Sequence, residues 1–128
     1  MIHKIQPSIL SGELIVPASK SDAQRAILAA SLCAGRSEVY NVGSSDDVRA
    51  MLNCVRQIGA TVLENENSVS IIGVSSFPKK ASFNCGESGL AFRLIAGICC
   101  VNDGIYHLNG AGSLLQRKHN FIDEFGAE

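Results

Sequence analysis

The sequence predicts an α/β (α+β) protein built from repeated β-α-β-α-β-β units, one full and one incomplete copy. Short alternating apolar segments, typical of strands, are interleaved with segments whose apolar residues recur at helical spacing. The order of elements starts again after Pro78, with matching residues 68 positions later. Hydrophobic residues make up 46% and charged residues 18% of the 128 residues, which indicates a globular chain and excludes a disordered one.

The first elements are two strands and a helix. Residues 2–6 and 13–17 alternate like two short strands joined by a turn. A helix then begins at Ser19 or Ser21, since either hydroxyl can cap it, and alanines at helical spacing carry it to Gly35.

A strand over residues 37–42 leads to a second helix. Ser44 and Ser45 open this helix, one apolar stripe runs along it, and Gly59 ends it. Residues 61–72 then alternate like a hairpin, which completes the first unit.

The second unit repeats the first at low identity. Five residues of the first unit recur 68 positions later: Arg25 as Arg93, Ile27 as Ile95, Asn41 as Asn109, Ser45 as Ser113 and Arg49 as Arg117. Repeat one spans about 13–73 and repeat two about 80–128, without the two closing strands. We therefore expect a truncated longer enzyme, the alternative being an unusual small protein, and an exposed apolar face where a neighbouring unit is missing.

Charge and cysteine usage limit the function classes. Eleven Lys and Arg face twelve Asp and Glu, so no bulk basic field favours nucleic acid or an anionic membrane. Five cysteines without a C-x-x-C pair predict reduced thiols in the cytoplasm, and three scattered histidines argue against a zinc site. The longest apolar run, residues 89–101, is too short to span a membrane, and the N-terminus has no leader pattern.

The first candidate site lies at residues 17–25, where a strand passes into a helix. Lys20, Ser21 and Arg25, together with free N–H groups at the helix start, can hold a phosphate or carboxylate. The alternative is an ordinary capped helix with surface charges. The Gly-rich loops of ATP and dinucleotide sites are absent, so the anion need not be a nucleotide.

Arg93 is the only charge within residues 89–101, on a helix that is apolar nearly all round, so we expect it to be buried and paired. Its partner is either an internal carboxylate, Glu87 or Asp103, or a ligand anion near the glycine-containing turn over 85–89.

Residues 116–119 form a short basic run at the start of a predicted helix. This run is either a solvated face or, for Arg117 and its repeat partner Arg49, a ligand or interdomain contact, because the helix dipole disfavours a cation there. The acids Asp46 and Asp47 are interpreted as helix-surface charges, and so are Asp123 and Glu124.

Three segments resemble one family, in the same order and spacing: PASKSDAQRAILAASLCAG, SSDDVRAMLNCVRQIGATV and NCGESGLAFRLIAG. They resemble the N-terminal part of 5-enolpyruvylshikimate-3-phosphate (EPSP) synthases, and the resemblance covers nearly the whole chain. That family builds a two-lobed enolpyruvyl transferase fold from six similar units. The resemblance implies that residues 1–19 are opening strands of the other lobe, and that residues 20–128 form an incomplete N-terminal lobe.

The resemblance implies transfer of the enolpyruvyl group of phosphoenolpyruvate to the 5-hydroxyl of shikimate 3-phosphate, with release of phosphate, on the route to chorismate. No metal or organic cofactor is implied. By matching position, Lys20 is the catalytic residue of this chain and contacts both substrates, Ser21 and Arg25 hold shikimate 3-phosphate, and Gly89 and Arg117 bind phosphoenolpyruvate. Convergent cations would also stabilise charge in the tetrahedral intermediate.

The loop before the third helix departs from the family pattern. Glu87 and Leu90 stand where the family has Asn and Thr, which puts an acid where an anionic substrate approaches. Glu87 then either pairs with an arginine or changes the response to competing inhibitors such as glyphosate. Ser88 and Arg93 would support this loop without contacting the substrate.

The remaining site residues, among them the proton-transfer carboxylates, would lie in the C-terminal lobe, so we expect this piece alone to be inactive. One alternative is a UDP-N-acetylglucosamine enolpyruvyl transferase, against which stand Lys20-Ser21 and the absence of Cys from 101–128. Another is a stand-alone, non-catalytic anion-binding or interaction module, since related repeats occur in RNA-processing enzymes such as the RNA 3'-phosphate cyclases. Seven aromatic residues, no Trp and a net charge of -1 argue against RNA.

Overall fold

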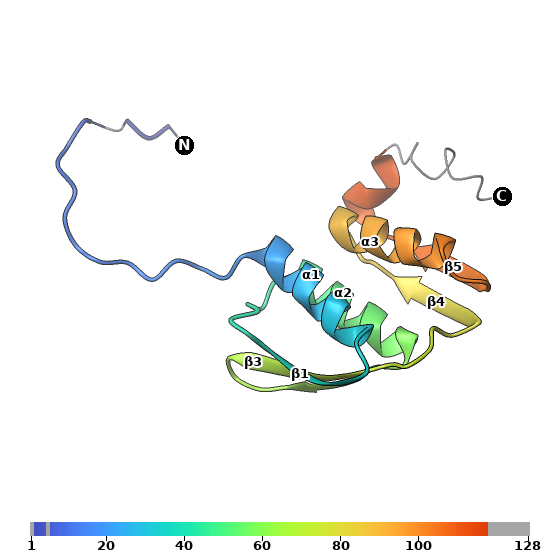
Figure 1. Cartoon of the computed structure of the whole chain (residues 1–128). Helices are drawn as coiled ribbons and strands as arrows, with labels where there is room; N and C mark the ends of the chain where they lie inside the picture. The colour runs from blue at the N-terminus through green and yellow to red at the C-terminus, as the bar shows by residue number, and fades with distance from the viewer. Residues whose placement is uncertain (1, 5, 118–128) are drawn as a thin grey trace.

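The computed structural model describes residues 2–4 and 6–117 and confirms the mixed α/β class (Figure 1). The elements in chain order are α1 (Lys20–Ser31), β1 (Gly35–Tyr40), α2 (Asp46–Ile58), β2 (Thr61–Glu64), β3 (Ser68–Gly73), β4 (Lys80–Asn84), α3 (Gly89–Cys100), β5 (Ile105–Asn109) and the 3-10 helix η1 (Gly112–Gln116).

The strands form two separate sheets. In the first sheet β3 lies between β1 and β2, antiparallel to both, and the β2–β3 hairpin is the one the sequence predicts. In the second sheet β4 and β5 pair in parallel, from Lys80 opposite Ile105 to Asn84 opposite Asn109. Because α3 connects two parallel strands, the ends of β4 and β5 bring the loops that follow them to the same edge.

The second helix forms as its sequence predicts. The Ser45 hydroxyl accepts a hydrogen bond from the Val48 N–H, and Gly59 ends the helix with a φ of 106°, a left-handed conformation that glycine adopts without strain. All five residues of the predicted apolar stripe are buried: Val48, Met51, Leu52, Val55 and Ile58. The local signals of cap, stripe and stop are therefore sufficient for this element.

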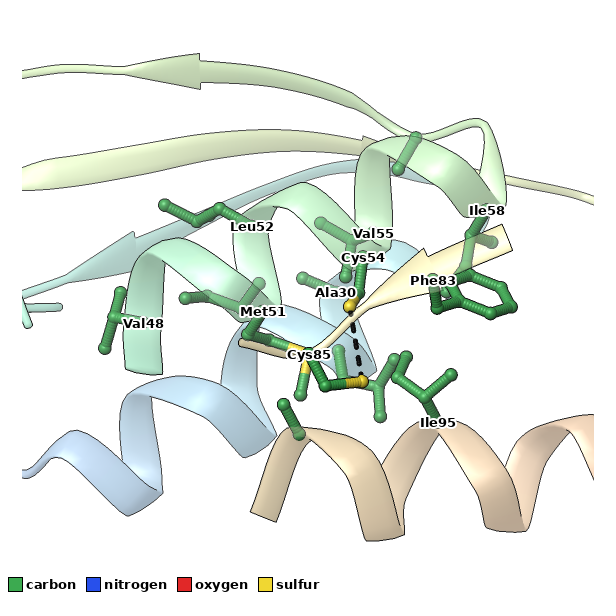
Figure 2. Close-up of a cluster of buried hydrophobic side chains, with 14 of the residues drawn as sticks. Ala30, Val48, Met51, Leu52, Cys54, Val55, Ile58, Phe83, Cys85 and Ile95 are labelled. Atoms are coloured by element: carbon green, nitrogen blue, oxygen red, sulfur yellow. Dashed lines mark hydrogen bonds between the residues drawn. The ribbon is translucent and has the colours of Figure 1, made fainter. Parts of the chain in front are cut away.

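The core lies between the helices and the two sheets. Met51, Cys54 and Val55 of α2 meet Phe83 of β4 and Ile95 of α3, all fully buried (Figure 2). The Cys54 and Cys85 sulfurs lie 4.0 Å apart within this cluster. The core thus fixes the Gly86–Gly89 loop, because Cys85 immediately precedes it.

The strands predicted over residues 2–6 and 13–17 do not form in the described residues, where 2–4 and 6–19 carry neither strand nor helix. Figure 1 shows this segment as an extended trace leading away from α1. Ile9 and Ile15 are 100% and 99% exposed. An alternating pattern produces a strand only beside a partner, and no described strand pairs with this segment.

Other boundaries also differ from prediction, and the strand expected over residues 37–42 spans Gly35–Tyr40. The first helix ends at Ser31, before the expected Gly35, and residues 112–116 form a short 3-10 turn in place of the start of an α-helix. His119, Asp123, Glu124 and the remainder of the second predicted helix lie outside the described residues. Within the part of the chain that is described, none of the helices has the length and hydrophobicity that a bilayer span requires.

Candidate functional site

An open polar pocket of about 370 Å³ brings together the starts of α1 and α3 and the end of η1. It is lined by Lys20, Ser21, Gln24, Asp47, Glu87, Gly89, Leu90, Ser113 and Arg117. Residues nearly a hundred positions apart in the sequence therefore face one space, among them four that the sequence singled out as substrate contacts.

Lys20 is the first residue of α1 and follows the cap at Ser19, whose hydroxyl accepts from the Asp22 N–H at 3.4 Å. Its ammonium lies 2.8 Å from the Asp47 carboxylate of α2. Both side chains are partly exposed, so this pair adds little to stability. Its consequence is orientation: Asp47 keeps the ammonium at the pocket while two of its three donors remain for a ligand.

Gln24 and Ser88 connect the start of α1 to the start of α3. Both are fully buried. The Ser88 hydroxyl donates to Gln24 Oε1 at 2.8 Å and accepts from the Ala91 N–H at 3.2 Å, capping α3. The Gln24 amide nitrogen donates in turn to the Lys20 carbonyl at 3.3 Å. One buried amide therefore sets the spacing between the turns that carry Lys20 and Gly89.

The loops after β4 and β5 are joined as an extension of the parallel strands. The Cys85 N–H donates to the Asn109 carbonyl and the Ala111 N–H to the Gly86 carbonyl, both at 2.8 Å. At the next position the main chain turns into α3, and the Glu87 carboxylate takes the place of a backbone carbonyl, accepting from the Ser113 N–H at 3.0 Å.

Arg117 lies beside Gly89. A Cβ added to Gly89 would stand 2.7 Å from Arg117 Nη1, so only glycine leaves room for the guanidinium in this place. Arg117 Nη2 also donates to the Ser113 hydroxyl at 3.1 Å. The guanidinium thus lies next to the first turn of α3, where unpaired N–H groups and the helix dipole favour an anion.

Neighbouring groups stabilise the charged form of Glu87. Its pKa is lowered, first by the hydrogen bond from the Ser113 N–H, then by one with the Ser113 hydroxyl, with a smaller contribution from the Arg117 charge. Burial and the Asp46 carboxylate oppose this shift. The carboxylate is therefore ionised and directed toward η1. The acid that the sequence places where an anionic substrate approaches is thus hydrogen-bonded within the protein.

Two predicted residues are not brought into the pocket lining. Arg25 lies on the exposed face of α1 and pairs with Asp22 at 3.4 Å. The expected burial of Arg93 is wrong: this side chain is exposed, and no ion pair to Glu87 or Asp103 forms in the described residues. The reason is that α3 packs only one face, that of Ala91, Ile95, Ala96 and Cys99, against the rest of the described fold, and Arg93 falls outside it.

Asp47 and Gln24 were missed as site residues. Asp47 was interpreted as a surface charge, although its position in the first turn of α2 is the one that reaches Lys20. No local signal marks Gln24 except that it is polar on the buried side of α1, where an amide needs a partner. No cluster of three His, Cys, Asp or Glu able to hold a metal ion occurs in residues 2–4 and 6–117.

Comparison with known proteins identifies the family of this chain. The profile of the EPSP synthase (3-phosphoshikimate 1-carboxyvinyltransferase) family matches residues 5–118. A 3-phosphoshikimate 1-carboxyvinyltransferase of Clostridium botulinum is 36% identical over 120 residues, covering 89% of this chain and 28% of the relative. One from Chlamydia felis is 34% identical, covering 99% of this chain and 30% of the relative.

Solved structures show the same fold. EPSP synthase from Acinetobacter baumannii superposes with a TM-score of 0.74 at 24% identity, over 88% of this chain and 27% of that one. The chain therefore spans less than a third of the length of these relatives. Since the family profile covers most of the sequence, the chain belongs to the EPSP synthase (3-phosphoshikimate 1-carboxyvinyltransferase) family.

Proposed function

We propose that this chain supplies one side of the substrate site of a 3-phosphoshikimate 1-carboxyvinyltransferase of the shikimate pathway. In that reaction the 5-hydroxyl of shikimate 3-phosphate gives up its proton as its oxygen bonds to C2 of phosphoenolpyruvate, and C3 of phosphoenolpyruvate takes up a proton. The tetrahedral adduct then loses phosphate from C2 and the proton from C3, which restores the double bond. Both substrates are anions, so the site must supply cations and N–H donors.

The observation that carries the proposal is the meeting of Lys20, Ser21, Gly89 and Arg117 around one pocket. These residues come from three separate elements, and they are four of the five substrate contacts that the family motifs imply, Arg25 being the one outside the pocket lining. Two cations and the N-terminal turns of two α-helices around one space form an arrangement suited to phosphate and carboxylate groups.

We assign the substrates as follows. Ser21 holds shikimate 3-phosphate, together with Arg25, which lies one helical turn further along α1. Gly89 and Arg117 hold phosphoenolpyruvate. Lys20 contacts both and stabilises the charge that develops in the tetrahedral adduct. Glu87, Ser88 and Arg93 support this arrangement without touching the reacting atoms.

The wider setting belongs to the same proposal. Residues 1–19 pack in the second lobe, which explains why the apolar side chains described within this segment, such as Ile9 and Ile15, are exposed. The C-terminal lobe supplies the proton-transfer carboxylates, and residues 20–128 belong to the N-terminal lobe. Five cysteines, all free thiols, are consistent with a cytoplasmic location.

The test is an NMR titration of the isotope-labelled chain with shikimate 3-phosphate, with UDP-N-acetylglucosamine as the control ligand. We expect amide shifts at Lys20, Ser21 and Arg25 with the first ligand only. Lys20→Ala is expected to abolish them, while Lys79→Ala, an exposed lysine outside the pocket, leaves them unchanged. Equal shifts with both ligands, or shifts that survive Lys20→Ala, would contradict the proposal.

A further inference from the structure

The acid at position 87 is the feature that the proposed function leaves unexplained. Its carboxylate lines the same pocket as Lys20 and Arg117, although a negative charge there opposes an anionic ligand. Two roles are open to it, repulsion of the ligand or support of the groups that bind the ligand, and the contacts of Glu87 distinguish them.

The hydrogen bond that the Glu87 carboxylate accepts comes from the segment that carries Arg117. Oε2 accepts from the Ser113 N–H at 3.0 Å. The Ser113 hydroxyl contributes to the lowered pKa of the same carboxylate, and it accepts from Arg117 Nη2 at 3.1 Å. A continuous path of hydrogen bonds thus runs from Glu87 through Ser113 to the guanidinium, while no ion pair joins Glu87 to Arg117 directly among the described side chains.

The backbone around this path is shaped to let the carboxylate in. Gly112 has a φ of 50°, and a Cβ there would stand 2.4 Å from the Glu87 carboxyl carbon. Gly110 is equally confined, because its Cβ would stand 2.6 Å from the Leu114 side chain. A larger residue at Gly112 would therefore displace the Glu87 carboxylate, and one at Gly110 would displace the Leu114 side chain.

We propose that Glu87 is a positioning residue, which holds Ser113 against the turn before α3 and so keeps the Arg117 guanidinium beside Gly89 for the anionic substrate. This inference rests on the proposed function for the identity of that substrate. The hydrogen-bond acceptor at position 87 holds Ser113, whereas the negative charge of the carboxylate opposes binding of the anionic substrate. The two can be separated by substitution.

The experiment compares Glu87→Gln, which keeps an acceptor oxygen without the charge, with Glu87→Ala, which removes both. Ser113→Ala breaks the path at the hydroxyl and retains the backbone N–H. Glu66→Ala, an exposed acid in the β2–β3 turn, is the matched control. Since Glu87 is exposed, none of these variants removes a core side chain.

The first readout needs no ligand: the Arg117 Nε–Hε signal in the NMR spectrum of each variant. We expect the wild type, Glu87→Gln and Glu66→Ala to share one ordered Arg117 signal. In Glu87→Ala and Ser113→Ala that signal should move toward the position of a free, mobile arginine. The Arg49 signal, from a guanidinium held by Asp46, serves as the internal reference.

The second readout is phosphoenolpyruvate affinity by titration. Glu87→Ala should bind about three- to tenfold more weakly, the range expected for one hydrogen bond, and Glu87→Gln should stay within about twofold of the wild type. Tighter binding by both variants would mean that Glu87 repels the ligand and would overturn the inference. An unchanged Arg117 signal in Glu87→Ala would overturn it as well.

The two proposals fail in different ways. If the wild type binds no phosphoenolpyruvate, the proposed function loses its support, while the Arg117 signal still decides whether Glu87 positions the guanidinium. If the wild type binds but Glu87→Ala is indistinguishable in both readouts, the positioning role is wrong and the proposed function stands.

Discussion

The two helix starts that face the pocket have the same local design and different surroundings. Ser19 and Ser88 cap α1 and α3 with nearly identical backbone angles, φ -75° and ψ 103° against φ -77° and ψ 101°. The cap of α1 is exposed and local. The cap of α3 is buried, and its hydroxyl also donates to Gln24 of α1.

The comparison separates two contributions to a binding site. At the start of α1 the first helical residue is Lys20, which brings a charge; at the start of α3 it is Gly89, which leaves space. The first turn of α1, which carries Lys20, needs only a capped helix, whereas the first turn of α3, which begins with Gly89, must be held in place by the rest of the fold. A substitution in the α3 turn should therefore lower the free energy of unfolding more than one in the α1 turn.

The largest expected effect distinguishes the two caps. Ser88→Ala removes the cap and leaves the buried Gln24 carbonyl without its donor, so the free energy of unfolding should fall by about 2–3 kcal/mol. Ser19→Ala removes only an exposed cap and should cost about 0.5–1 kcal/mol. Urea denaturation measures both, and equal losses would show that the buried bond contributes nothing.

A double-mutant cycle tests whether Gln24 is the reason for that difference. Gln24→Met combined with Ser88→Ala should lose less than the sum of the single variants, with a coupling of about 1 kcal/mol. Gln57→Met, on the exposed side of α2, is the control and should be additive with Ser88→Ala. A coupling near zero for Gln24 would remove the proposed link between the turns.

The space at Gly89 can be filled directly. Gly89→Ala places a methyl group against the Arg117 guanidinium, the far end of a flexible side chain, so stability should change by less than about 1 kcal/mol while phosphoenolpyruvate affinity falls severalfold. Gly97→Ala, on the same helix with open space around its Cβ, should leave affinity unchanged and raise stability slightly. Unchanged affinity in both variants would show that Arg117 needs no room at Gly89.

The smallest expected effect is a pH dependence. The pKa of Glu87 is lower in the fold than in the unfolded chain, so its contribution to stability is present above the unfolded pKa and is lost as the pH falls through the folded pKa. Denaturation at several acidic pH values should therefore show a steeper loss for the wild type than for Glu87→Gln. Parallel curves would mean that the carboxylate gains nothing from Ser113.

The sequence predicted most reliably what nearby residues determine. Ser45, the apolar stripe and Gly59 specify α2 from end to end, because caps and periodicity are local. The strands over 2–6 and 13–17 failed because strand formation depends on a partner that may lie anywhere in the chain. Arg93 failed for a related reason: an apolar helix does not reveal which of its faces will be covered.

The site shows the same limit. Motif positions placed Lys20, Ser21, Gly89 and Arg117 together, yet Gln24 and Asp47 entered only with the structure. Their roles depend on contacts across 64 positions to Ser88 and 27 positions to Lys20, which no local pattern records. The sequence shows that Glu87 departs from the family pattern. It does not show which way the Glu87 carboxylate points, because that depends on the hydrogen bond from the Ser113 N–H.

The buried thiols of Cys54 and Cys85 allow the opening of the core to be followed over time. Cys54 and Cys85 are buried, and hydrogen bonding between the thiols together with burial raises the pKa of Cys54, so an alkylating reagent can reach these sulfurs only after the core separates. Cys33 and Cys100 are exposed and react without that delay. The slow labelling of Cys54 and Cys85, resolved by mass from that of the buried Cys99, would time how often the core next to the Gly86–Gly89 loop opens.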